Sequence, residues 1–168
     1  MNSLATYRDY QVQRATLRDV WKIRQLEKLV FPQDAYPLLE IVMLILAPIS
    51  RNFKMIAPNG DMAGFISGTV GTMGRPGWII TLGVNPKYQR KGLGRFLLQW
   101  CERELQAECI RLTVRAGNRA AYTLYAETGY TEVRRRRSYY RDGEDGIEME
   151  KCLNPQPVLP SSPLPPAS

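Results

Sequence analysis

The hydrophobic pattern of the 168-residue chain changes between the two-residue period of strands and the 3.6-residue period of helices. Short apolar runs bounded by Gly, Pro or Asn predict strands, and longer segments with apolar residues three or four positions apart predict helices. We expect strands over residues 10–14, 53–57, 62–71, 78–84, 110–114, 130–137 and 146–151. We expect helices over residues 16–31, 37–46, 95–107 and 119–128.

The ends of these elements carry residues with strong local preferences. Thr16 followed by Asp19 resembles a capping box, and Pro32 must stop the helix that begins there. The turn 58–61, Pro-Asn-Gly-Asp, favours a hairpin, and Gly129 is expected to cap the last helix. In the longest helix, the side chains expected to face the core are Phe96, Leu97, Trp100 and Leu105.

This order of elements predicts an α/β fold with one mixed sheet of about seven strands and about four helices. The strand at 110–114 has a crossover helix on each side of it in the sequence, and a chain of this length can bury one core. Six prolines and no charge lie between residues 155 and 166. We therefore expect one domain over residues 1–152 and a flexible, Pro-rich tail over 153–168.

Composition excludes several classes of chemistry. The chain has no histidine, which rules out His-based catalytic triads and imidazole metal ligands. Its three cysteines, Cys101, Cys109 and Cys152, show no CxxC spacing, so we expect reduced thiols without a zinc site or a disulfide, and no metal. No apolar run is long enough for a membrane span or a secretory signal, and a cytoplasmic protein is expected.

The positive charge is concentrated in one part of the chain. The net charge is +7, and the segment 84–119 accounts for most of it, so an anionic ligand is expected there. The basic run 134–137 is followed by five acidic residues between 142 and 150 that nearly cancel it. We interpret this run as the solvated face of a hairpin.

The segment 89–94, Gln-Arg-Lys-Gly-Leu-Gly, lies between a predicted buried strand and a predicted helix. Its two glycines allow a tight turn whose amides point at one spot, and the helix N-terminus adds partial positive charge. The segment is neither a Walker A loop nor a dinucleotide-binding GxGxxG motif. A glycine-rich turn can also be purely structural, so this motif on its own leaves both interpretations open.

Together with residues 80–88, 112–130, 137–140 and 144–149, this segment resembles the GCN5-related N-acetyltransferase (GNAT) superfamily. The superfamily signature is Gln/Arg-x-x-Gly-x-Gly/Ala after a central strand, and within it the chain is most similar to protein N-terminal acetyltransferases, including the RimI type that acetylates a ribosomal protein. The resemblance covers residues 10–152 and implies the GNAT fold with acetyl-CoA as cofactor. The residues that it implies in cofactor binding are Leu82, Gly83, Val84, Gln89, Arg90, Lys91, Gly92, Leu93, Gly94, Arg95, Asn118 and Tyr125.

The same resemblance assigns roles to two residues of the last predicted helix. Tyr125 matches the tyrosine that protonates the departing CoA thiolate, although helical periodicity alone favours a core position. Asn118 matches an asparagine that hydrogen-bonds the cofactor, and it can also serve as an ordinary helix N-cap. Direct attack by the amine suffices, so Cys101 and Cys109 are interpreted as packing residues rather than nucleophiles.

The general base expected from the resemblance is missing from the sequence. Thr113 occupies the position of the RimI-type glutamate, and Trp78 and Thr113 stand where other N-terminal acetyltransferases place tyrosine or histidine. Asp34, or a water held by backbone carbonyls, could remove the proton instead. A CoA-binding protein without activity is the remaining alternative.

The acceptor groove implied by the resemblance lies between residues 31–36 and the closing hairpin. The residues expected to bind the acceptor are Phe31, Pro32, Tyr36, Tyr139 and Tyr140. The leading function is acetylation of the N-terminal α-amine of a protein or peptide, with a ribosomal protein as one candidate acceptor. The alternatives are a small-molecule amine acetyltransferase and a non-catalytic module that binds CoA, ribosomes or RNA, while nucleic acid and membrane partners are not favoured.

Overall fold

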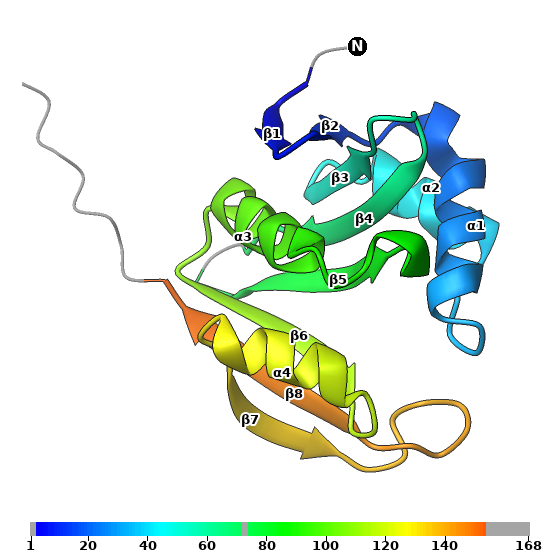
Figure 1. The fold of residues 1–168 in the computed structure, drawn as a ribbon. Coiled ribbons are helices and arrows are strands. Elements are labelled where there is room, and N and C mark those ends of the chain that lie inside the picture. Colours follow the sequence, from blue (N-terminus) through cyan, green and yellow to red (C-terminus); the bar gives the residue numbers. More distant parts are fainter. Residues whose placement is uncertain (1–2, 72–73, 154–168) are drawn as a thin grey trace, which may run out of the picture.

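The structure is a computed structural model that describes residues 3–71 and 74–153. It contains one eight-stranded sheet with four α-helices, and Figure 1 shows their arrangement. The strands are β1 (Ala5–Tyr7), β2 (Tyr10–Arg14), β3 (Ser50–Ile56), β4 (Met62–Thr69), β5 (Gly77–Val84), β6 (Cys109–Arg115), β7 (Thr131–Arg136) and β8 (Gly146–Cys152). The helices are α1 (Val20–Val30), α2 (Leu38–Leu46), α3 (Leu93–Leu105) and α4 (Arg119–Glu127).

The predicted α/β class and the mixed sheet are confirmed, with one strand more than expected. The additional strand, β1, has only three residues, too few to show an alternating pattern. Helix α3 begins at Leu93, two residues before the predicted start, because Gly92 adopts a left-handed conformation that turns the chain into the helix. The predicted tail lies outside the described residues except for Leu153, so the proposed domain boundary stays a prediction.

The sheet has the order β1-β2-β3-β4-β5-β6-β8-β7. Strands β5 and β6 are parallel and pair only at Gly77 with Ile110 and at Trp78 with Arg111. Beyond this point the two strands diverge, as Figure 1 shows. The divergence leaves the edges of β5 and β6 without their usual ladder partners, and a ligand can use the freed backbone groups.

Helices cover both faces of the sheet. Helices α3 and α4 pack over the larger core, which includes Ile79, Leu97 and Tyr125, whereas α1 and α2 pack over a smaller core around Phe65 on the opposite face. The expected inward face of α3 is confirmed: Leu97 and Leu105 are buried, and Phe96 and Trp100 pack against the same core. The diverging strands therefore lie between two layers of helices, with access to both faces.

The expectation of reduced cysteines without a disulfide is wrong for one pair. Cys109 and Cys152 lie opposite each other in the β6–β8 register and form a disulfide. They are 43 residues apart in the sequence, so only the pairing of the two strands reveals that they are neighbours. Cys101 is a free, buried thiol whose pKa is raised to about 12 by burial, as expected of a packing residue.

Candidate active site

A cavity of about 780 Å³ opens where β5 and β6 diverge. Residues of α1 and of the α1–α2 connection line one end of the cavity, together with the β7–β8 connection. The N-terminal end of α3 and residues along the length of α4 line the other end. The cavity therefore passes through the sheet and can bring a ligand on the α3–α4 face close to a second ligand on the α1 face.

The turn before α3 has the geometry of an anion site. Arg90 and Gly92 both have positive φ, 62° and 81°, which turns the following amides in one direction. Within the described part of the chain, no acceptor pairs with the amides of residues 92–95. The Arg90 guanidinium forms no ion pair with any residue that the structure describes, whereas Arg95 pairs with Glu127 of α4. Free amides, a helix N-terminus and a free cation together fit a diphosphate such as that of acetyl-CoA.

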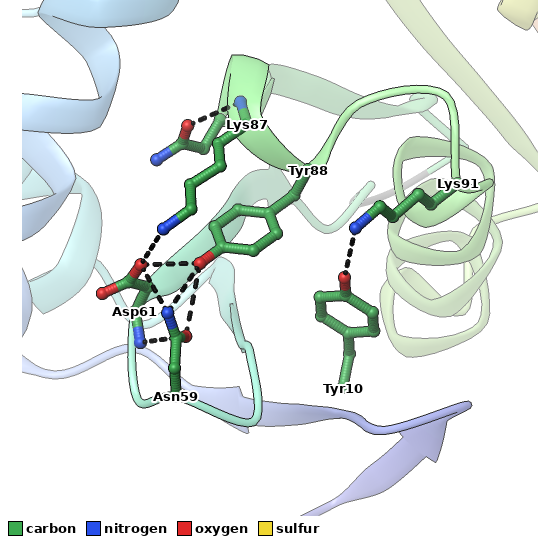
Figure 2. A network of polar contacts seen from close by, with 7 residues as sticks. Tyr10, Asn59, Asp61, Lys87, Tyr88 and Lys91 are labelled. Carbon is green, nitrogen blue, oxygen red and sulfur yellow. Dashed lines mark hydrogen bonds and ion pairs between the residues drawn. The ribbon is translucent and has the colours of Figure 1, made fainter.

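A network of polar contacts, shown in Figure 2, connects the segment that leads into α3 to the β3–β4 turn and to β2. The carboxylate of Asp61, in the β3–β4 turn, accepts hydrogen bonds from Tyr88 Oη at 2.6 Å and from Lys87 Nζ at 3.2 Å. These contacts and one from Asn59 lower the pKa of Asp61 to about 2. Lys91 Nζ donates to Tyr10 Oη at 3.3 Å. Lys91 does not line the cavity, so its side chain is not one of the cations there.

A β-bulge in β5 gives its neighbouring side chains different directions. The register with β4 passes from Ser67–Thr81 to Gly68–Ile79, so Ile80 is an extra residue. Ile79 packs in the core under α3, while Thr81 donates a hydrogen bond to Glu27 of α1 at 2.7 Å. Because of the bulge, Ile79 and Thr81 point to opposite faces of the sheet, although strict alternation would place residues i and i+2 on the same face.

Tyr125 lies on α4, lines the cavity and is buried. Its ring packs edge-on against Tyr130, and its hydroxyl forms no hydrogen bond with the described residues. Burial raises the pKa of Tyr125 to about 12, so the hydroxyl keeps its proton at neutral pH. Asn118 caps α4 by accepting a hydrogen bond from the Ala121 amide at 3.1 Å, and it also lines the cavity. Their roles toward a cofactor stay predictions.

Asp34 is held by an arginine that the sequence did not single out for the acceptor site. Both oxygens of Asp34 accept hydrogen bonds from Arg115 of β6, at 2.6 and 2.7 Å. Arg115 also donates to Asp142 and Glu144, and these contacts raise its pKa. The guanidinium lies 4.1 Å from the centre of the Tyr140 ring. This arrangement ties the α1–α2 connection to the β7–β8 connection, and it does not favour Asp34 as a proton acceptor.

Most of the residues predicted for the site line the cavity. They are Phe31, Asp34, Tyr36, Leu82, Val84, Gln89, Arg90, Gly92, Leu93, Gly94, Arg95, Asn118, Tyr125, Tyr139 and Tyr140. Pro32, Gly83 and Lys91 do not line it, and a Cβ on Gly83 would lie 3.5 Å from Phe31. Thr113 lines the cavity, as do residues that the prediction missed, including Glu27, Thr81 and Arg115. Glu27 could have been noticed, because it is a charged residue on the apolar face of α1.

Comparisons with known proteins agree with this geometry. Residues 17–130 match the Acetyltransferase (GNAT) family. An N-alpha-acetyltransferase of Sulfurisphaera tokodaii is 30% identical over 87% of this chain and 95% of its own length. The [ribosomal protein bS18]-alanine N-acetyltransferase of Escherichia coli K12 is 40% identical over 58% of this chain and 68% of its own length. The crystal structure of the E. coli ribosomal-protein-S18-alanine N-acetyltransferase superposes with a TM-score of 0.76, at 30% identity, over 85% of this chain and 93% of that one.

Proposed function

The chain belongs to the acetyltransferase (GNAT) family, whose members use acetyl-CoA, and from this premise we propose that it acetylates the N-terminal α-amine of a protein or peptide. The observation that carries the proposal is the acceptor end of the cavity, where two connections tied by Arg115 present Tyr36, Tyr139 and Tyr140. Paired aromatic residues with hydroxyl groups suit the backbone of an extended peptide. The similarity to an N-alpha-acetyltransferase over nearly the whole of both chains supports the same acceptor.

The residues present fit acetyl-CoA, which supplies an acetyl group activated as a thioester. The amides of residues 92–95 and Arg90 would hold its diphosphate, and the β5 edge from Leu82 to Val84 would pair with its pantetheine arm. An α-amine has a pKa of about 7.7–8.0, so a sizeable share of acceptor is already neutral near pH 7. The protein therefore has to orient the amine, accept one proton and supply another.

The charges at the acceptor end favour a cationic acceptor. Three carboxylates, of Asp34, Asp142 and Glu144, contact the guanidinium of Arg115, so this cluster carries a net negative charge, and Arg136 lies over the Tyr139 ring beside it. The ammonium form of a peptide N-terminus is attracted to such a region before it loses its proton. The basic run of β7 offers less to an anion, because Arg135 pairs with Asp145 and Arg136 pairs with Glu148.

An acetylation assay on peptides tests the proposal. Peptides with a free N-terminus and an internal lysine, including one copied from the N-terminus of ribosomal protein bS18, are incubated with acetyl-CoA, and mass spectrometry locates the new acetyl group. We expect the label on the α-amine and none on matched peptides whose N-terminus is blocked. Labelling confined to lysine, or found only on small amines, would contradict the proposal.

Arg115→Met is expected to raise the KM for the peptide by about tenfold, which corresponds to about 1.4 kcal/mol, while the Kd for CoA stays close to the wild-type value. The substitution keeps much of the apolar volume of the side chain but releases both connections, since Asp34 and Glu144 lose their shared partner. Steady-state kinetics with the peptide and calorimetry with CoA measure the two constants. Arg135→Met, which removes an exposed pair with Asp145 on the same hairpin, is the matched control and should change neither constant. Equal weakening of peptide and CoA would contradict the assigned role.

A further inference from the structure

Glu27 is a buried carboxyl group that the mechanism above leaves without a role. It lies on α1, is 2% exposed and belongs to the lining of the cavity. Its Oε1 accepts a hydrogen bond from Thr81 Oγ1 at 2.7 Å, and its Oε2 is buried without a hydrogen-bond partner among the described residues. A buried carboxylate oxygen without a partner costs free energy, so its presence beside a cavity calls for an explanation.

The surroundings of Glu27 favour uptake of a proton. Burial raises its pKa, while the hydrogen bond from the Thr81 hydroxyl and the nearby backbone of Tyr36 oppose the increase. The titratable group that faces Glu27 from the α1–α2 connection is Tyr36, whose own pKa rises to about 12 through burial and the nearby charge of Glu27. Glu40 and Asp34 add negative charge near Tyr36, and Arg24 donates to the Tyr36 carbonyl rather than to Glu27. No cation pairs with Glu27 within residues 3–71 and 74–153.

The other carboxylate predicted for this task is less suitable. Both oxygens of Asp34 accept hydrogen bonds from Arg115, and a proton placed on Asp34 would have to break that bidentate pair. Glu27 has one oxygen that accepts no hydrogen bond within the part of the chain that the structure describes, and its other oxygen contacts Thr81 of β5. The residues that follow Thr81 on β5 are predicted to bind the pantetheine arm of acetyl-CoA. Of the two groups, only Glu27 has a carboxylate oxygen that accepts no hydrogen bond from the described residues.

We propose that Glu27 is the general base of the acetyl transfer and accepts, directly or through one water, the proton that the attacking amine loses. The inference rests on the proposed function in that it requires an amine acceptor. The amine nitrogen forms the C–N bond to the acetyl carbon, the C–S bond breaks, the nitrogen proton goes to Glu27, and Tyr125 gives its proton to the sulfur. Exchange with solvent then returns Glu27 and Tyr125 to their starting states.

The substitution Glu27→Gln tests the role in catalysis. The Gln side-chain oxygen can still accept the hydrogen bond from Thr81, so the packing of α1 on β5 is retained. We expect kcat/KM at pH 6.5 to fall by about a hundredfold, and the deficit to persist above pH 8, because an amine that arrives neutral still loses one proton as the C–N bond forms. The Kd for CoA, measured by calorimetry, should stay within about threefold of the wild-type value.

Thr81→Val separates this role from a structural one. The variant removes the hydrogen bond to Glu27 but keeps the carboxyl group. Because that hydrogen bond lowers the pKa of Glu27, we expect the acid limb of the pH–rate profile to move to higher pH, with a much smaller loss of the plateau rate than in Glu27→Gln. If the contact only holds α1 against β5, Thr81→Val will lose as much activity as Glu27→Gln, with no shift of the acid limb, and the proposal is wrong.

Thermal unfolding without ligand gives a second, independent measurement. The pKa of Glu27 in the folded state lies above its ordinary value of 4.5, so the stabilisation from its bound proton is complete below pH 4.5 and is lost as the pH rises through the folded pKa. The Tm of the wild type minus that of Glu27→Gln should therefore fall as the pH rises above 4.5 and passes through the folded-state pKa of Glu27. A Tm difference that does not change with pH overturns the proposal. So does a Glu27→Gln variant that acetylates the peptide as fast as the wild type at every pH. A wild type that acetylates no α-amine would instead contradict the proposed function.

Discussion

Gly94→Asp is expected to weaken CoA binding by at least about a hundredfold while leaving the fold intact. Gly94 is the second residue of α3 and lines the cavity. A Cβ built on it would lie 3.5 Å from Val84 Cγ2 and 3.6 Å from Leu124 Cδ2, which is ordinary contact distance. The new carboxylate would therefore fit sterically, but it would stand beside the amides expected to bind the diphosphate.

The stability of the variant should not fall, because a carboxylate in the first turn interacts favourably with the helix dipole. The same interaction lets the introduced carboxylate compete with the CoA diphosphate for the amides of the anion site. The carboxylate also repels the diphosphate electrostatically, which weakens CoA binding further. Calorimetry with CoA and the Tm measure the two effects separately.

Gly94→Asn is the matched control, since it adds nearly the same volume without the charge. We expect Asn to weaken CoA binding at least about tenfold less than Asp does, and the gap to narrow at high salt. Equal Kd values for the two variants would show that shape alone is at work. Wild-type affinity in Gly94→Asp would remove the turn from the cofactor site.

The parts of the site that the sequence predicted are the local ones. The turn before α3 needs only its two glycines, the basic residues and the helix that follows, which are all adjacent in the sequence. Asn118 as the N-cap of α4 is local in the same sense, and the structure confirms that hydrogen bond. Such features do not depend on how distant segments are arranged, so a single sequence is sufficient to predict them.

The features that the sequence did not predict depend on contacts between distant segments. In the sequence, nothing distinguishes Arg115 from an ordinary residue at the end of a strand, but in the structure it forms ion pairs with both Asp34 and Glu144 at the acceptor end. The Cys109–Cys152 disulfide follows from strand register, and the hydrogen bond of Glu27 with Thr81 follows from a β-bulge. Periodicity shows which face of an element is buried but not which side chain of another element meets it there.

The leaving sulfur also requires a proton, and Tyr125 is the residue predicted to supply it. Tyr125 lines the cavity and is buried, and its hydroxyl lacks a hydrogen-bond partner among the described residues. Because burial raises the pKa of Tyr125 to about 12, the group remains protonated up to about pH 11 and can donate to a developing thiolate throughout the neutral range. Where bound substrates displace water from the cavity, a free thiolate is disfavoured, and a hydrogen-bond donor at this point contributes more than it would in water.

Tyr125→Phe is therefore expected to lower kcat by about 10²- to 10³-fold, with the Kd for CoA within about threefold of the wild-type value. The Tm should change little, because the ring contact with Tyr130 survives and the lost hydroxyl has no partner among residues 3–71 and 74–153. Stopped-flow detection of free CoA thiol measures the transfer step, and calorimetry measures binding. Tyr122→Phe, on the same helix but absent from the cavity lining, is the control and should retain the wild-type rate. If Tyr125→Phe also retains it, solvent protonates the sulfur and the tyrosine serves only in packing.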